Sequence, residues 1–226
     1  MSSDKYILIT GGSGDIGSAI CTKLADKGYI PLIGYARNQE KAEQVAEITK
    51  GITVKLDLCD QENIEAVCDE IKERYSSLHG VVLAASPPPT LLPFTKVSSE
   101  QMQHHWSANV LGPQLLLSSI IKKVLKPRKS GSVHAILTKA MGTQEDLAMK
   151  QMGAYVIGKY GLLGILKLIE AEYSWLDVSY TSPGFTDTKM LEAFDPRFLE
   201  IMSAQQSFAK PDDVADDVVS ALLKAG

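Results

Sequence analysis

Short runs of apolar and β-branched residues alternate along the chain with longer segments whose apolar positions recur at helical spacing. The apolar runs predict strands at Tyr6–Thr10, Ile30–Tyr35, Ile52–Leu56, Gly80–Ala84, Ser132–Leu137 and Val178–Thr181. Helical spacing predicts helices at Asp15–Lys27, Gln39–Thr49, Gln61–Tyr75, Ser98–Leu125, Met152–Tyr173 and Pro211–Lys224. Strands that alternate with helices are typical of βαβ units, so the pattern indicates an α/β protein with a parallel sheet.

Right-handed crossovers between parallel strands favour a Rossmann-type, doubly wound sheet of about six strands with helices on both faces. The length of 226 residues fits a single domain, residues 1–226, that buries a sizeable core. In such a fold, ligands bind beyond the carboxyl ends of the strands. The irregular segments Ser86–Pro93 and Pro183–Ala209 follow predicted strands, so we expect them to form site walls or lids.

The net charge of -4 gives no general electrostatic reason to expect a nucleic acid or a membrane as partner, and it favours a small diffusible one. The three cysteines form no CxxC pair and no metal-ligand spacing with histidine, so we expect reduced thiols and no metal site. No stretch is long and apolar enough for a signal peptide or a membrane span. We therefore expect a cytoplasmic protein.

A glycine-rich turn, Thr10–Gly17, joins the first predicted strand to the first helix. Its glycines allow a sharp turn and a close approach to a diphosphate, which the exposed amides and dipole of the helix start would stabilise. A structural turn without a ligand is the alternative. The turn resembles the TGxxxGxG motif of the short-chain dehydrogenase/reductase family. Asp15 stands where the family has its middle glycine, and we expect its carboxylate to point to solvent or to cap the helix.

The residues after the second strand bear on the choice of cofactor. Dinucleotide folds that prefer NAD carry an acid there, whereas this chain has Arg37 and no carboxylate, which suits the 2'-phosphate of NADP(H). The alternative is a solvated surface arginine. Asp57 matches the family's adenine-contacting acid, with a simple helix cap as the alternative.

Tyr155 and Lys159 are one helical turn apart and so share a helix face. A nearby ammonium stabilises phenolate, so we expect Lys159 to lower the pKa of Tyr155 and to ready it for proton transfer. Such a pair is common on helix surfaces. The family resemblance implies that Tyr155 is the acid/base, that Lys159 also bonds the nicotinamide ribose and that Asn109 joins a water-mediated proton relay. Asn109 lies in an apolar helical stretch, where a kink-making or a buried structural role is the alternative.

The resemblance implies further site residues. Thr138 aligns with the catalytic serine, Thr143 is a second candidate for that position, and Thr188 should bond the nicotinamide carboxamide. The cofactor set implied by the family comprises Gly11, Ser13, Asp15, Ile16, Gly17, Arg37, Asp57, Leu58, Ala84, Tyr155, Lys159, Pro183, Gly184, Thr186 and Thr188. The apolar positions from Met190 to Met202 predict a substrate lid, or else packing on the core or on a second subunit.

Three other features change the picture less. We expect His104 and His105 to be surface histidines, because adjacent residues diverge on a helix. The basic cluster Lys122–Lys129 precedes the fifth strand, so we expect it at the end of the sheet opposite the cofactor. We expect these side chains to be solvated, and the alternative is that they dock an acidic carrier protein. The family's NNAG segment is replaced by Leu83–Ser86, so the floor of the site must be held differently.

The family's closing strand has no counterpart, so we expect the seventh strand to be missing and a homodimer through the two long helices, Ser98–Leu125 and Met152–Tyr173. The sequence thus predicts an NADP(H)-dependent oxidoreductase that reduces a ketone to a secondary alcohol with Tyr155 as acid/base. Its substrate is a small carbonyl or alcohol, and the family also allows a carrier-bound 3-oxoacyl thioester. The alternative is a catalytically weak NADP(H)-binding sensor or scaffold protein.

Overall fold

A six-stranded parallel sheet organises the computed structural model, which describes residues 4–223. The strands are β1 Tyr6–Thr10, β2 Ile30–Tyr35, β3 Ile52–Lys55, β4 Leu78–Leu83, β5 Gly131–Ile136 and β6 Leu176–Thr181. Their order is β3-β2-β1-β4-β5-β6 and every pairing is parallel. The order reverses between β1 and β4, so their carboxyl ends form the crevice in which ligands of doubly wound folds bind. The predicted fold class is confirmed.

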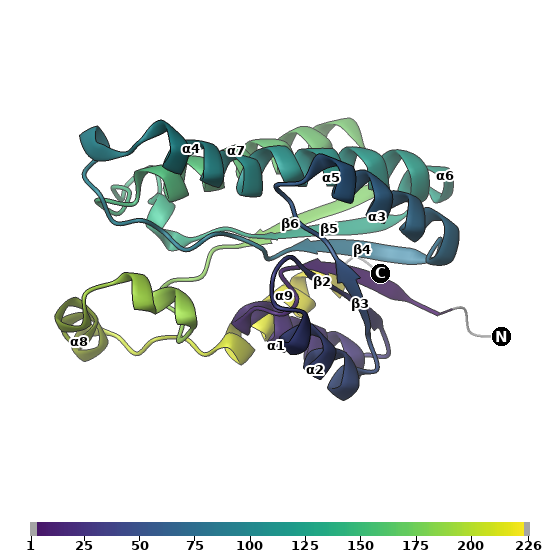
Figure 1. Cartoon of the computed structure of the whole chain (residues 1–226), viewed down its shortest axis with the longest axis horizontal. Coiled ribbons are helices and arrows are strands. Elements are labelled where there is room, and N and C mark those ends of the chain that lie inside the picture. The colour runs from purple at the N-terminus through teal and green to yellow at the C-terminus, as the bar shows by residue number, and fades with distance from the viewer. Residues whose placement is uncertain (1–3, 224–226) are drawn as a thin grey trace.

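Helices cover both faces of this sheet (Figure 1). One face carries α1 Asp15–Asp26, α2 Gln39–Thr49 and α9 Pro211–Leu223, and the other carries α3 Gln61–Arg74, α4 Ser99–Trp106, α5 Gly112–Ile120 and α7 Gly153–Glu172. Each layer buries an apolar stripe against the strands, such as Ile20 and Leu24 of α1 and Leu162 and Leu166 of α7. The last residue of the predicted final helix, Lys224, lies outside the described residues.

The predicted long helix Ser98–Leu125 is interrupted by two π-helical segments. Between α4 and α5 the backbone widens over Ser107–Leu111, and after α5 it widens again over Ile121–Leu125 before α6 Lys126–Arg128. The Asn109 amide lies in the first π segment and donates to the His105 carbonyl at 3.1 Å. Each π segment covers only about one turn, which is too short to show as a change in the spacing of apolar positions.

The segment predicted as irregular between Pro183 and Ala209 contains structure of its own. A short 3-10 helix, η5 Lys189–Ala193, leads into α8 Pro196–Gln205, whose first amides are capped by the Asp195 carboxylate. In Figure 1, α8 projects beyond the carboxyl ends of the strands. The segment is therefore placed as a cover over that end of the sheet.

The opposite end of the sheet holds the basic cluster, as predicted. The Arg128 guanidinium donates to the carbonyls of Ser76 and Leu78, at the start of β4, and Lys123 pairs with Asp69. Part of this charge therefore fixes the helix end to the sheet. Over residues 4–223, no helix has the length and apolar character needed to cross a membrane.

Candidate active site

The glycine-rich turn wraps the carboxyl end of β1 tightly. Gly11 adopts a positive φ of +65°, and a Cβ on Gly17 would lie 2.1 Å from the Gly11 carbonyl oxygen. Gly14 precedes α1 without a side chain to cap the helix, so the amides of the first turn remain available to an anion. These observations fit a turn that cradles a diphosphate, as its sequence predicts.

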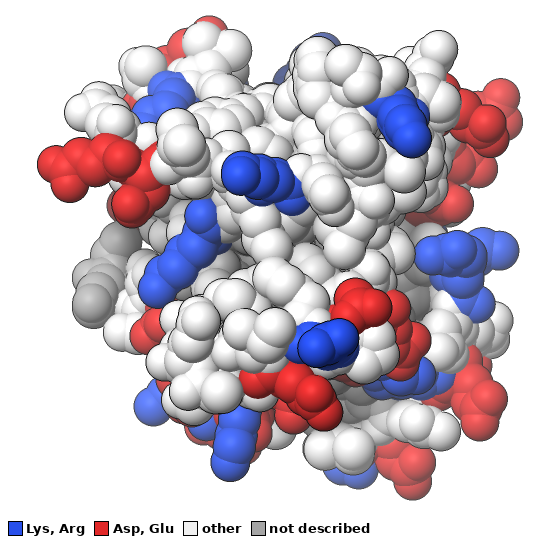
Figure 2. All heavy atoms as spheres, turned by 90° about the vertical axis from the view of Figure 1, so that its left-hand side faces the viewer, with Lys and Arg blue, Asp and Glu red and all other residues white. Residues whose placement is uncertain are grey.

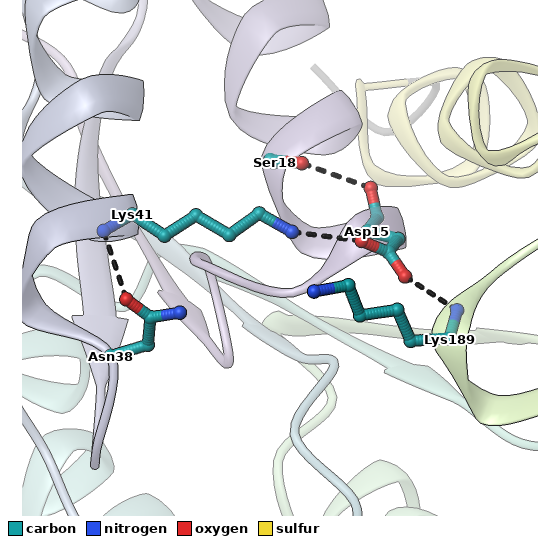
Figure 3. Close-up of polar contacts among 5 residues, drawn as sticks. All are labelled: Asp15, Ser18, Asn38, Lys41 and Lys189. Carbon is teal, nitrogen blue, oxygen red and sulfur yellow. Dashed lines mark hydrogen bonds and ion pairs between the residues drawn. The ribbon is translucent and has the colours of Figure 1, made fainter. Parts of the chain in front are cut away.

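Asp15 does not behave as expected from the sequence. It neither caps α1 nor points freely to solvent; its carboxylate accepts from Lys41 Nζ and from the backbone N–H of Lys189, both at 2.8 Å (Figure 3). The prediction was wrong because both partners lie far away in the sequence. Burial raises the pKa of Asp15, but the hydrogen bonds from Lys41 and Lys189 outweigh burial and lower it overall.

The floor of the site, where the family's NNAG segment is replaced by Leu83–Ser86, is held by the hydroxyl of a threonine. Thr10, at the end of β1, accepts from the backbone amides of Ala84 and Ala85 at 3.1 and 3.2 Å. These bonds join the ends of β1 and β4 directly. Ala84 is thereby fixed on the wall of the site, where the sequence predicts it.

The loops after β2 and β3 lie close together at the expected adenosine end. The Asp57 carboxylate accepts from the Cys59 amide at 2.9 Å, while the cap of α3 is Asp60, so Asp57 is not the helix cap. The Cys59 thiol has a raised pKa through burial and the Asp57 charge, opposed by the nearby Arg37 guanidinium. Arg37 is exposed, and Leu58 packs in the core.

A cavity of about 390 Å³ opens beyond the ends of β4, β5 and β6. The predicted residues on its wall are Ile16, Ala84, Thr138, Tyr155, Lys159, Pro183, Gly184, Thr186 and Thr188. Thr143 is absent from this wall and forms an exposed turn with Asp146, so Thr138 is the hydroxyl that faces the cavity. Figure 2 looks onto this end of the molecule, where uncharged side chains dominate the central surface.

Tyr155 and Lys159 both lie in the first half of α7 and both are buried. Lys159 Nζ donates to the Ile136 carbonyl at the end of β5, at 2.8 Å, and sits 5.7 Å from the centre of the Tyr155 ring. Burial lowers the pKa of Lys159 to about 7. Burial also raises the pKa of Tyr155 to about 12, with an opposing effect from the Thr138 hydroxyl. The prediction that Lys159 lowers the pKa of Tyr155 was therefore wrong: burial sets the direction, the opposing effect comes from Thr138, and the phenol holds its proton at neutral pH.

His105 is the clearest residue that sequence reasoning misplaced. It is 2% exposed rather than on the surface, and its ring meets the Tyr155 ring edge-on with 6.0 Å between centres. Its Nδ1 has no hydrogen-bond partner among the described residues, and burial lowers its pKa to about 4. Two adjacent histidines do diverge on a helix, but one of the two directions here leads into the core.

Asn109 is fully buried behind the cavity wall. Its side-chain oxygen accepts from the Ser86 hydroxyl at 2.9 Å, and Ser86 lines the cavity. The amide thus links the π segment of the helix to the loop after β4. The helix is locally widened at Asn109, while both the kink-making role and the relay role of its side chain stay predictions.

An apolar lid, residues 189–206, packs against Phe185 and closes the outer side of the cavity. The Phe185, Phe194 and Phe198 rings pack against one another, and the Met190 thioether lies 4.0 Å from the Tyr155 hydroxyl. This cluster also includes Met152, which the sequence analysis did not single out. Its position three residues before Tyr155, one helical turn away, was the signal that could have identified it.

The chain resembles known proteins over nearly its whole length. It is 25% identical to the 3-oxoacyl-(acyl-carrier-protein) reductase of Staphylococcus aureus strain Mu50 over 228 residues, covering 96% of this chain and 90% of that protein. It is 28% identical to the acetoacetyl-CoA reductase of Acinetobacter sp. strain RA3849 over 236 residues, covering 100% of this chain and 93% of that protein.

Solved structures share the fold. The 3-ketoacyl-(acyl-carrier-protein) reductase from Brucella melitensis, complexed with NADH, superposes with a TM-score of 0.87 at 18% identity and covers 97% of this chain and 91% of that one. The alcohol dehydrogenase from the archaeon Thermococcus sibiricus, complexed with 5-hydroxy-NADP, superposes with a TM-score of 0.83 at 23% identity. This match covers 98% of this chain and 91% of that one. The model of the short chain dehydrogenase family matches residues 5–197. The chain belongs to the short-chain dehydrogenase family and is an oxidoreductase of that family.

Proposed function

We propose that this chain is an NADP(H)-dependent ketoreductase of one domain that converts a ketone to a secondary alcohol. One observation carries the proposal: Thr138, Tyr155 and Lys159 converge on a single cavity whose outer wall is apolar. A carbonyl group could reach both hydroxyls there while its substituents pack against the lid. Relatives named as reductases of 3-oxoacyl and acetoacetyl thioesters make a thioester of this kind the first substrate to test.

The proposed chemistry assigns one task to each side chain. Thr138 donates a hydrogen bond to the carbonyl oxygen and fixes its position. Tyr155, protonated at neutral pH because burial raises its pKa to about 12, gives its proton to that oxygen as negative charge develops. Lys159 stabilises the resulting phenolate from the same helix face, and a bound reduced nicotinamide supplies the hydride.

The residues fit a dinucleotide along the crevice. The uncapped first turn of α1 and the closely packed Gly11 and Gly17 suit the diphosphate, and Arg37 suits a 2'-phosphate. We assign Asp57 and Leu58 to the adenine end and Thr186 and Thr188 to the nicotinamide end. We also propose a homodimer, with the long helices as the first surface to test.

The test follows NADPH consumption with acetoacetyl-CoA and with ethyl acetoacetate, in the wild type and in Tyr155→Phe. We expect turnover in the wild type and at least a 100-fold loss in Tyr155→Phe, with NADPH binding retained in a fluorescence titration. Tyr173→Phe, at the other end of α7, is the matched control and should keep full activity. Tight NADPH binding without turnover on a broad ketone panel would instead favour the sensor or scaffold function.

A further inference from the structure

Both oxygens of the Asp15 carboxylate are occupied by groups from distant parts of the chain. One oxygen pairs with Lys41 Nζ of α2, and the other accepts from the Lys189 backbone amide, each at 2.8 Å. Figure 3 shows the carboxylate lying between these two segments at the start of α1. The side chain is 24% exposed, so both contacts are partly shielded from water.

Lys189 is the first residue of the lid, defined as residues 189–206. The next residue, Met190, places its thioether 4.0 Å from the Tyr155 hydroxyl, and Leu191 and Phe194 line the cavity. The backbone hydrogen bond accepted by Asp15 therefore holds the first residue of the lid, two residues beyond the backbone bond from Asp187 to Ala209.

The lid has few other polar attachments within residues 4–223. Its remaining backbone bonds beyond the helices, such as Leu191 to Thr188 and Phe194 to Leu191, are local. Among residues 4–223, the Asp15–Lys189 bond and the long Tyr155–Met190 contact are the only hydrogen bonds involving a side chain that join the lid to another part of the fold. The rest of its attachment is apolar packing, which is less directional.

We propose that Asp15 is a positioning residue that fastens the substrate lid to the glycine-rich turn and so sets the wall of the pocket above Tyr155. The effect on substrate rests on the proposed function, whereas the effect on the lid does not. The glycine that the family motif has at this position offers no acceptor, so this attachment is a property of the side chain found here.

The first test measures amide hydrogen exchange over the lid in the cofactor-free protein. Asp15→Ala removes the acceptor, and because one such bond contributes about 1 kcal/mol, exchange at Lys189 and along η5 should become about fivefold faster. Asp15→Asn keeps an acceptor oxygen and should restore protection. Lys41→Met removes only the ion pair and should leave the Lys189 amide protected. If Asp15→Ala does not fold, Asp15→Gly, with the residue of the family motif, serves in its place.

The second test is kinetic, with ethyl acetoacetate and NADPH. A displaced lid weakens substrate binding more than proton transfer, so Asp15→Ala should raise KM severalfold with little change in kcat, and Asp15→Asn should recover most of the loss. Equal exchange at Lys189 in wild type and Asp15→Ala, or equal loss in Asp15→Asn and Asp15→Ala, would overturn the proposal. An inactive wild type with faster lid exchange in Asp15→Ala would refute the proposed function and leave the positioning role standing.

Discussion

Protonation of His105 should make the stability of this protein fall in mildly acidic solution. The ring is 2% exposed, and burial lowers its pKa from 6.5 to about 4. Between these two values the unfolded chain binds a proton that the folded chain does not. Stability contributed by the neutral ring is therefore fully present above pH 6.5 and is lost as the pH falls toward 4.

The size of the effect follows from the two pKa values. At pH 5 the unfolded histidine is almost fully protonated and the folded one almost fully neutral, so the free energy of unfolding should drop by about 2 kcal/mol relative to pH 7. His134, buried in β5 and hydrogen-bonded to the Ser179 and Thr181 hydroxyls, has the same lowered pKa of about 4 and should contribute a similar loss.

The substitution His105→Leu separates the contribution of His105 to the pH dependence of stability from that of His134. Urea unfolding of the cofactor-free protein at pH 7 and pH 5 should show a drop that is about 2 kcal/mol smaller in His105→Leu than in the wild type. His104→Leu alters the exposed neighbour on the same helix and should keep the full drop. If His105→Leu and the wild type lose the same free energy between these pH values, the reasoning from burial is wrong.

Substitutions of Gly17, Arg37 and Thr138 test the site itself. Gly17→Ala would put a Cβ 2.1 Å from the Gly11 carbonyl oxygen, so we expect a lower Tm and NADPH binding weakened by about tenfold or more. Gly164→Ala is the control, because no atom lies within 4 Å of the added Cβ. It should change neither the Tm in thermal unfolding nor the affinity in an NADPH titration. Arg37→Asp should weaken binding of NADPH by roughly tenfold and leave NADH binding nearly unchanged; equal losses would remove Arg37 from the 2'-phosphate site. Thr138→Val should lower kcat by about 100-fold while Thr138→Ser stays active, and a fully active Thr138→Val would exclude a role for the hydroxyl.

Local patterns carried enough information to predict the architecture. Apolar runs such as Ile7–Ile9 mark buried strands whatever surrounds them, and the alternation of strands and helices restricts the connections to a few right-handed crossovers. The glycines of the first turn and the spacing of Tyr155 and Lys159 are equally local, because each depends on backbone geometry within a few residues. These features also placed the cavity at the correct end of the sheet.

Contacts between distant segments decided the rest. The Asp15 carboxylate accepts a hydrogen bond from the amide of Lys189, which is 174 positions away in the sequence, and no sequence pattern around Asp15 predicts that partner. His105 is buried because α4 packs on α7, and the same burial raises the pKa of Tyr155 rather than lowering it. The sequence by itself determined which chemical groups are present and at which end of the sheet they gather. Only the tertiary structure decided which of them are shielded from water, since desolvation depends on the elements packed around a group and not on its neighbours in the chain.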